Sequence, residues 1–123
     1  MAKIVVLDDH VETCGVIKFR LEQDGHEVVT VSKGKEAIEQ CLASKVDVLI
    51  TDWDLEDGYD GLEIAEIFRI ENPDIKLLLI TGYSVDAISQ HTSADQFYGL
   101  IPKPFKLDEI AVAVNKALTC TDT

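Results

Sequence analysis

Long apolar runs are absent from the 123-residue sequence, and none approaches the roughly 20 residues that a membrane-spanning helix needs. The N-terminal stretch MAKIVVLDDH also lacks the long apolar region and the small-residue cleavage site of a signal peptide. We therefore expect a cytoplasmic protein that does not associate with membranes.

Cysteine is scarce, and Cys14, Cys41 and Cys120 form neither a CxxC pair nor an even set, which argues against a disulfide framework or a zinc site. We expect Cys14 and Cys41 to fill small core positions on helices.

Positive charge is also scarce, since 11 Lys and Arg residues stand against 23 Asp and Glu residues, for a formal net charge of −12. No cluster of Lys and Arg offsets this charge locally, so direct binding to nucleic acid is not expected. What the sequence does contain is 46% hydrophobic residues, enough for a proper core. At this length we expect one domain over residues 1–119, followed by a short polar tail at 120–123.

Five short apolar runs alternate with stretches that have helical spacing. The runs cover residues 3–7, 27–31, 46–50, 75–80 and 97–101, and the helical stretches cover 11–21, 37–42, 62–68, 84–91 and 107–118. Strict alternation predicts an α/β fold with a five-stranded parallel sheet and helices on both faces. The first, third and fourth runs are almost wholly apolar and suit the centre of a sheet, whereas Glu27 and Gly99 in the other two are better tolerated at edges. This favours the flavodoxin-like, doubly wound strand order 2-1-3-4-5.

The residues expected to face the core recur on one face of each helical stretch. They are Val11, Cys14, Ile17 and Leu21 in the first stretch, Ala37, Ile38, Cys41 and Leu42 in the second, Leu62, Ala65 and Phe68 in the third, and Leu107, Ile110, Ala111, Val114 and Leu118 in the last. Gly25 and the pair Asn72-Pro73 stand where the first and third helices should end.

Polar residues follow four of the five predicted strands. They are Asp8 and Asp9 after the first strand, Asp52 after the third, Thr81 after the fourth and Lys103 after the fifth. In a parallel sheet these ends lie on one side, and three neighbouring carboxylates are tolerated only with a cation among them or a proton on one of them. An oxygen-only site of this kind suits Mg²⁺ bound beside a phosphoryl group. The pattern therefore predicts phosphoryl transfer, with Lys103 and Thr81 available to the phosphoryl oxygens.

The acidic stretch TDWDLEDGYDGLE, residues 51–63, admits two other interpretations. Counted from Asp52, it places an acid at each side-chain ligand position of an EF-hand calcium loop, yet Asp57 stands where that loop needs glycine, and a strand precedes it instead of a helix. The pair Asp52 and Asp54 also resembles the D-x-D motif of haloacid dehalogenase phosphatases. That alternative leaves Asp8 and Asp9 without a role.

The ordered set VVLDDH, VDVLITDWDL, LLLITGY and IPKPF, which spans essentially the whole chain, resembles the receiver domain of response regulators in two-component signalling, the CheY-like superfamily. The resemblance implies that Asp52 accepts a phosphoryl group from a phosphohistidine of a sensor histidine kinase or histidine phosphotransfer domain. It implies Mg²⁺, with Mn²⁺ as an alternative, bound by Asp9, Asp52 and the backbone carbonyl of Asp54, while Asp8 acts largely through water. Such a domain is no conventional enzyme, although it catalyses its own phosphorylation and its own slow dephosphorylation.

The same resemblance assigns roles around the phosphoryl group. Lys103 pairs with a phosphoryl oxygen, and a cis bond to Pro104 aims its ammonium group inward. Thr81 moves toward another oxygen and draws the loop after the fourth strand with it, while Asp54 and Tyr83 tune the access of water. The usual aromatic partner of this switch is replaced by Leu100.

Three further expectations complete this picture. We expect His10 to begin the first helix at the rim of the site and Trp53 to pack beside the pocket, where its fluorescence would report metal binding. A phosphorylation-dependent dimer is also expected. The rival hypothesis is a pseudo-receiver, an interaction module that binds partners regardless of phosphorylation.

Overall fold

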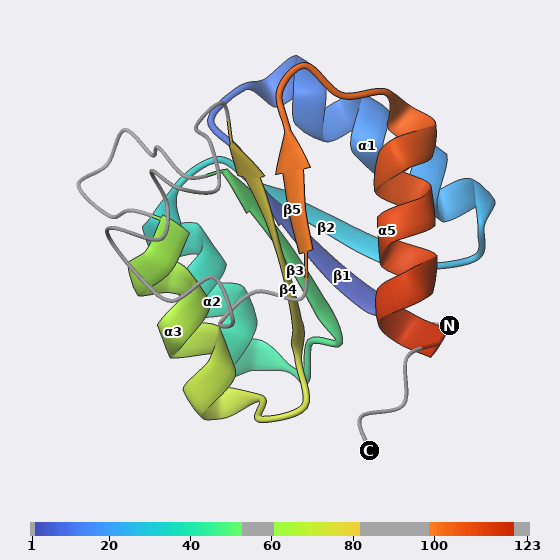
Figure 1. The fold of residues 1–123 in the computed structure, drawn as a ribbon. Coiled ribbons are helices and arrows are strands. Elements are labelled where there is room, and N and C mark those ends of the chain that lie inside the picture. Colours follow the sequence, from blue (N-terminus) through green and yellow to red (C-terminus); the bar gives the residue numbers. More distant parts are fainter. Residues whose placement is uncertain (1, 53–60, 82–98, 120–123) are drawn as a thin grey trace.

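The structure is a computed structural model that describes residues 2–52, 61–81 and 99–119 (Figure 1). The described strands and helices follow one another in the order that the sequence predicts. In order, they are β1 (Lys3–Leu7), α1 (Val11–Gln23), β2 (Glu27–Val31), α2 (Gly34–Ala43), β3 (Val48–Asp52), α3 (Gly61–Glu71), β4 (Lys76–Thr81), β5 (Gly99–Pro102) and α5 (Leu107–Thr119). The helix predicted over residues 84–91 lies outside the described residues.

The five strands form one parallel sheet in the order β2-β1-β3-β4-β5, which confirms the predicted flavodoxin-like topology and both predicted edge strands. The third strand is displaced from its prediction, since it runs from Val48 to Asp52 instead of over residues 46–50. The reason is that Val46 is buried ahead of the strand, while the polar Thr51 and Asp52 continue the ladder beside Leu79 and Ile80 of β4. The limits of the apolar run therefore predict both ends of this strand two residues too early.

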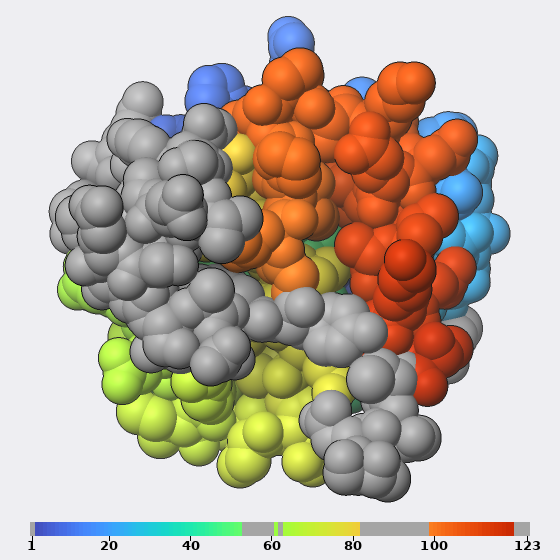
Figure 2. Space-filling view, viewed as in Figure 1, coloured from blue at the N-terminus to red at the C-terminus, as the bar shows by residue number. Residues whose placement is uncertain are grey.

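Helices cover both faces of the sheet, with α1 and α5 on one face and α2 and α3 on the other (Figure 1). Alternate residues of each strand point to opposite faces. Ile4 and Val6 of β1 accordingly pack in the cluster beneath α1 and α5, whereas Val5 and Leu7 pack in the cluster beneath α2 and α3. In Figure 2 the edge strand β5 and α5 form adjoining parts of the visible surface.

The helices bury most of the side chains that the sequence assigned to the core. Both cysteines predicted as core residues, Cys14 and Cys41, are buried. Two assignments were wrong, because Val11 is 73% exposed and Leu42 is 66% exposed. Each residue of a helix is turned by about 100° from the previous one. This turn places both side chains, each near a helix end, outside the arc that faces the sheet. Ile38, Leu107 and Leu118 are half-buried, and the side chain of Leu62 lies outside the described set.

The chain reverses after α1 and α3 at the residues predicted to end these helices. Gly25 has φ of +90°, the left-handed region that glycine adopts at little cost. Asn72 is 7% exposed, and its Oδ1 accepts the Val46 N–H at 3.0 Å while its Nδ2 donates to the Phe68 carbonyl at 3.3 Å. One buried amide therefore fastens the end of α3 to the segment that leads into β3. No helix within the described ranges is long and apolar enough to cross a membrane.

Candidate phosphorylation site

The carboxyl ends of the central strands carry a group of buried polar side chains. Asp8 follows β1, Asp52 is the last residue of β3 and Thr81 is the last residue of β4, and their exposed fractions are 1%, 3% and 2%. Asp9, next to Asp8, has a side chain that is 15% exposed. The parallel sheet thus brings together the polar residues that the sequence placed at its strand ends.

Lys103 reaches this group from beyond β5. Its Nζ lies 2.9 Å from Asp52 Oδ2, and its backbone N–H donates to the Thr81 carbonyl at 2.8 Å. The Lys103-Pro104 peptide bond is cis, as the resemblance implies. Burial lowers the pKa of Lys103, but the hydrogen bond to Asp52 and the charges of Asp52, Asp8 and Asp9 outweigh it and raise the pKa above the ordinary value. The ammonium group is therefore held charged beside Asp52.

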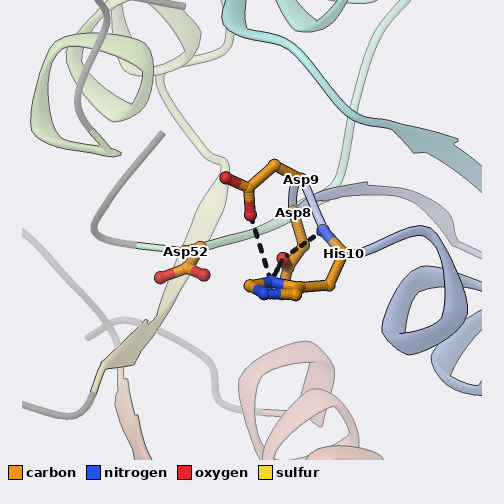
Figure 3. A group of neighbouring side chains, drawn as sticks. All are labelled: Asp8, Asp9, His10 and Asp52. Carbon is orange, nitrogen blue, oxygen red and sulfur yellow. Dashed lines mark hydrogen bonds and ion pairs between the residues drawn. The ribbon is translucent and has the colours of Figure 1, made fainter. Parts of the chain in front are cut away.

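His10 completes the group at the rim (Figure 3). It is the N-cap residue of α1, which begins one residue after the predicted start at His10, and its side chain is 69% exposed. Its backbone N–H donates to Asp8 Oδ1 at 2.9 Å, and its Nδ1 lies 3.0 Å from the same oxygen and 3.1 Å from Asp9 Oδ1. Sequence reasoning missed these contacts, because they depend on how the backbone turns between β1 and α1. The available signal was a histidine directly after two predicted metal-binding acids.

The carboxylates and His10 shift one another's protonation. Burial raises the pKa of Asp8, the two hydrogen bonds from His10 and the charge of Lys103 lower it, and the charge of Asp52 raises it further, for a net increase. The pKa of His10 is raised by its hydrogen bond to Asp8 and by the charges of Asp8 and Asp9. The pocket consequently favours bound cations and protons.

The donor atoms fit a divalent cation. One ligand atom from each of Asp8, Asp9, His10 and Asp52 can be chosen so that all four lie within 4.8 Å of one another. Asp9 Oδ1 is buried and makes no hydrogen bond within the described ranges, since its 3.1 Å contact with His10 Nδ1 lacks hydrogen-bond geometry. A buried carboxylate oxygen that makes no hydrogen bond is costly. Hard carboxylate oxygens are the ligands that Mg²⁺ prefers, so the residues present suit this ion.

Three of the predicted site residues, Trp53, Asp54 and Tyr83, lie outside the described residues. Leu100, the residue in place of the aromatic switch, is half-buried on β5 and packs against the cluster beneath α2 and α3. It pairs with Leu79 of β4 in the sheet. Asp52 ends a strand, and the calcium-loop interpretation, which needs a helix there, does not fit.

A comparison with protein families identifies the chain. The family model described as "Response regulator receiver domain" matches residues 4–115. The chain belongs to this family. It is a receiver domain of two-component signalling, and its acidic pocket of Asp8, Asp9 and Asp52 is consistent with a phosphorylation site. The haloacid dehalogenase alternative is left without support.

Curated relatives match nearly all of this chain, but the share of their own length that it covers differs widely. The sensor kinase CckA of Brucella abortus (strain 2308) is 31% identical over 121 residues, which are 97% of this chain and 13% of CckA. The nitrogen assimilation regulatory protein NtrX of Azorhizobium caulinodans is 26% identical over 94% of this chain and 26% of NtrX. The response regulator receiver protein CpdR of B. abortus is 26% identical over 96% of this chain and 98% of CpdR. The chain thus spans only a small part of the first two relatives.

Solved structures agree with the fold. The response regulator TrrA of Thermotoga maritima, crystallised in complex with Mg(2+)-BeF, is 30% identical, with a TM-score of 0.82 over 95% of this chain and 99% of that one. A receiver domain protein from Clostridium thermocellum is 28% identical, with a TM-score of 0.83 over 96% of this chain and 94% of that one.

Proposed function

We propose that this receiver domain is the phosphoacceptor of a two-component response regulator and that Asp52 takes up the phosphoryl group. The observation that carries the proposal is the 2.9 Å pair between Lys103 Nζ and Asp52 Oδ2, placed beside Asp8 and Asp9 at the carboxyl end of the sheet. Phosphoryl transfer uses these groups together. They are a nucleophilic carboxylate at the end of β3, an ammonium group beyond β5 and two further acids after β1. In this proposal the domain works in the cytoplasm, where it receives the phosphoryl group from a sensor histidine kinase or a histidine phosphotransfer domain.

In the proposed transfer, an Asp52 carboxylate oxygen attacks the phosphorus of the partner's phosphohistidine. The P–N bond breaks, its electron pair leaves with the imidazole nitrogen, and an acyl phosphate remains on Asp52. Lys103 moves from the Asp52 carboxylate to a phosphoryl oxygen and neutralises part of its charge. Water that attacks the same phosphorus slowly breaks the P–O bond to Asp52, which releases inorganic phosphate and restores the carboxylate. Asp54 and Tyr83 tune the access of this water.

Asp9, Asp52 and the backbone carbonyl of Asp54 would hold Mg²⁺ or Mn²⁺, and Asp8 would act on it through water. Such an ion, when bound, offsets the negative charge of the carboxylates and of the phosphoryl oxygens. Support comes from Asp9 Oδ1, which is buried and makes no hydrogen bond within the described residues, and from TrrA, whose structure contains Mg(2+)-BeF.

The proposed switch joins Thr81 to the surface around β4 and β5. Thr81 donates its hydroxyl to the phosphoryl group and carries the following loop with it. Lys103 N–H is bonded to the Thr81 carbonyl, so the strand ends of β4 and β5 move as neighbours. Leu100, half-buried in β5, takes the place of the family's aromatic partner. The rearranged surface is the basis for a phosphorylation-dependent dimer.

Incubation with Mg²⁺ and acetyl phosphate, followed by intact-protein mass spectrometry, tests the proposal. The wild type should gain one phosphoryl group, and Asp52→Asn should gain none. Asp74→Asn is the matched control, because Asp74 is an exposed acid between α3 and β4, at the opposite end of the sheet. No gain in the wild type, or a gain that persists in Asp52→Asn, would overturn the proposed function in favour of a pseudo-receiver.

A further inference from the structure

His10 places a ring nitrogen among the carboxylates of the acidic pocket. Its Nδ1 lies 3.0 Å from Asp8 Oδ1 and 3.1 Å from Asp9 Oδ1 (Figure 3). Two ligands that bind one ion at right angles through bonds of about 2.1 Å lie about 3.0 Å apart. His10 Nδ1 therefore already lies at the spacing of a neighbouring ligand from each of the two carboxylate oxygens.

The backbone holds His10 in this position. Its φ of −90° and ψ of 99° are extended, and its N–H donates to Asp8 Oδ1 at 2.9 Å, which fixes the turn between β1 and α1. The side chain makes no cap hydrogen bond to α1. With 69% of its side chain exposed, the ring can adjust toward an ion without disturbing the core.

The buried Oδ1 of Asp9, which makes no hydrogen bond within the described residues, is a second observation that points to a cation here. His10 Nδ1 is within 3.1 Å of Asp9 Oδ1, but the geometry allows a hydrogen bond only to Asp8. A single Nδ1–H cannot serve both carboxylates, whereas a cation bound between the three atoms would satisfy both oxygens and the nitrogen lone pair.

We propose that His10 is a nitrogen ligand of the pocket and shifts its preference from Mg²⁺ toward ions that favour imidazole, such as Zn²⁺, Ni²⁺ and Fe²⁺. Oxygen ligands alone suit Mg²⁺, while imidazole suits these later transition ions, which also bind mixed N/O sites more tightly. The inference rests on the proposed function only in that Asp9 and Asp52 belong to the same metal site.

Long-range ¹H–¹⁵N spectra of the histidine side chains test the ligand directly, with Zn²⁺ as the diamagnetic probe. A Cys120→Ser background removes one thiol that could also bind Zn²⁺. Zn²⁺ should shift the Nδ1 resonance of one histidine, and this resonance should vanish in His10→Asn and persist in His26→Asn. The latter is the matched control, because His26 lies between α1 and β2, at the far end of the sheet, where it faces Ala2 N–H.

Calorimetry with Zn²⁺ and with Mg²⁺ tests the preference. His10→Asn should weaken Zn²⁺ binding by about tenfold or more, the loss usual when a metal-site partner is removed, and should change Mg²⁺ binding by less than about twofold. An unchanged His10 resonance in the Zn²⁺-bound protein, equal losses for both ions, or no binding of Zn²⁺ would overturn the inference.

The two proposals fail separately in these experiments. Metal binding is measured without a phosphodonor, so a Zn²⁺-shifted His10 in a protein that gains no phosphoryl group overturns only the proposed function. An acyl phosphate that forms with Mg²⁺, together with a His10 resonance that Zn²⁺ leaves in place, overturns only the role of His10.

Discussion

Replacement of Asn72 by Ala should destabilise the domain strongly and leave its chemistry in place. Asn72 is 7% exposed, and its amide joins the Val46 N–H to the Phe68 carbonyl. The substitution leaves the buried Val46 N–H without an acceptor and removes the bond to Phe68. The pocket at the carboxyl end of the sheet loses no contact with either group.

The expected loss follows from these two bonds. A buried donor without a partner costs about 1–3 kcal/mol, and the second hydrogen bond contributes about 1 kcal/mol, so the free energy of unfolding should fall by about 2–4 kcal/mol. For a domain of this size the melting temperature should then fall by roughly 10 °C. A loss of about 2–4 kcal/mol is a large share of the roughly 5–15 kcal/mol that stabilises a typical domain.

Urea unfolding followed by circular dichroism measures the change, with Asp74→Asn as the control for an exposed neighbour, expected within about 0.5 kcal/mol of the wild type. The variant should still gain a phosphoryl group from acetyl phosphate below its melting temperature. A loss under about 0.5 kcal/mol for Asn72→Ala would refute the assigned role of the amide. A folded variant that no longer accepts the phosphoryl group would refute the independence of the two ends of the sheet.

Three further predictions concern single residues. Lys103→Met should slow phosphorylation of Asp52 by acetyl phosphate about 100-fold, because it removes a preplaced positive charge, and a rate within threefold of wild type would count against this role. Gly15→Ala should raise the free energy of unfolding by about 0.5–1 kcal/mol in urea titrations, since Gly15 is inside α1 and an added Cβ meets no atom within 4 Å; a decrease would contradict this. Burial raises the pKa of the Cys14 thiol to about 11 from 9.0, so the folded state holds this proton more tightly, and stability should fall as pH rises from 9 toward 11. Cys14→Ala should lack this part of the pH dependence, and identical pH profiles of the two proteins would exclude it.

The strand order and the end of the sheet that carries the site were predictable from the positions of polar and apolar residues along the sequence. Glu27 and Gly99 mark the edge strands, and polar residues at the ends of apolar runs mark the chemical end of a parallel sheet. The limits of β3 were not predictable in this way, because Thr51 and Asp52 are polar and still belong to the ladder.

Contacts that depend on the exact course of the backbone could not be predicted either. The contact of His10 Nδ1 with two carboxylates requires the extended backbone between β1 and α1, which periodicity does not reveal. The sequence marked Asn72 only as the end of a helix, since its partner Val46 is 26 positions away in the chain. Val11 and Leu42 look like core residues in helical spacing, but helix ends turn such side chains outward.

The division of the core by the sheet has a consequence for how substitutions combine. Ile17 of α1 and Phe68 of α3 are both fully buried, yet they belong to separate clusters on opposite faces. Substitutions of residues that share no partners change the free energy of unfolding independently, and these changes add to within about 0.5 kcal/mol. The five-stranded sheet therefore separates two clusters whose contributions to stability are independent. Packing under α1 and α5 can be varied to set the stability of the domain while the coupling energy to the face under α2 and α3 stays near zero.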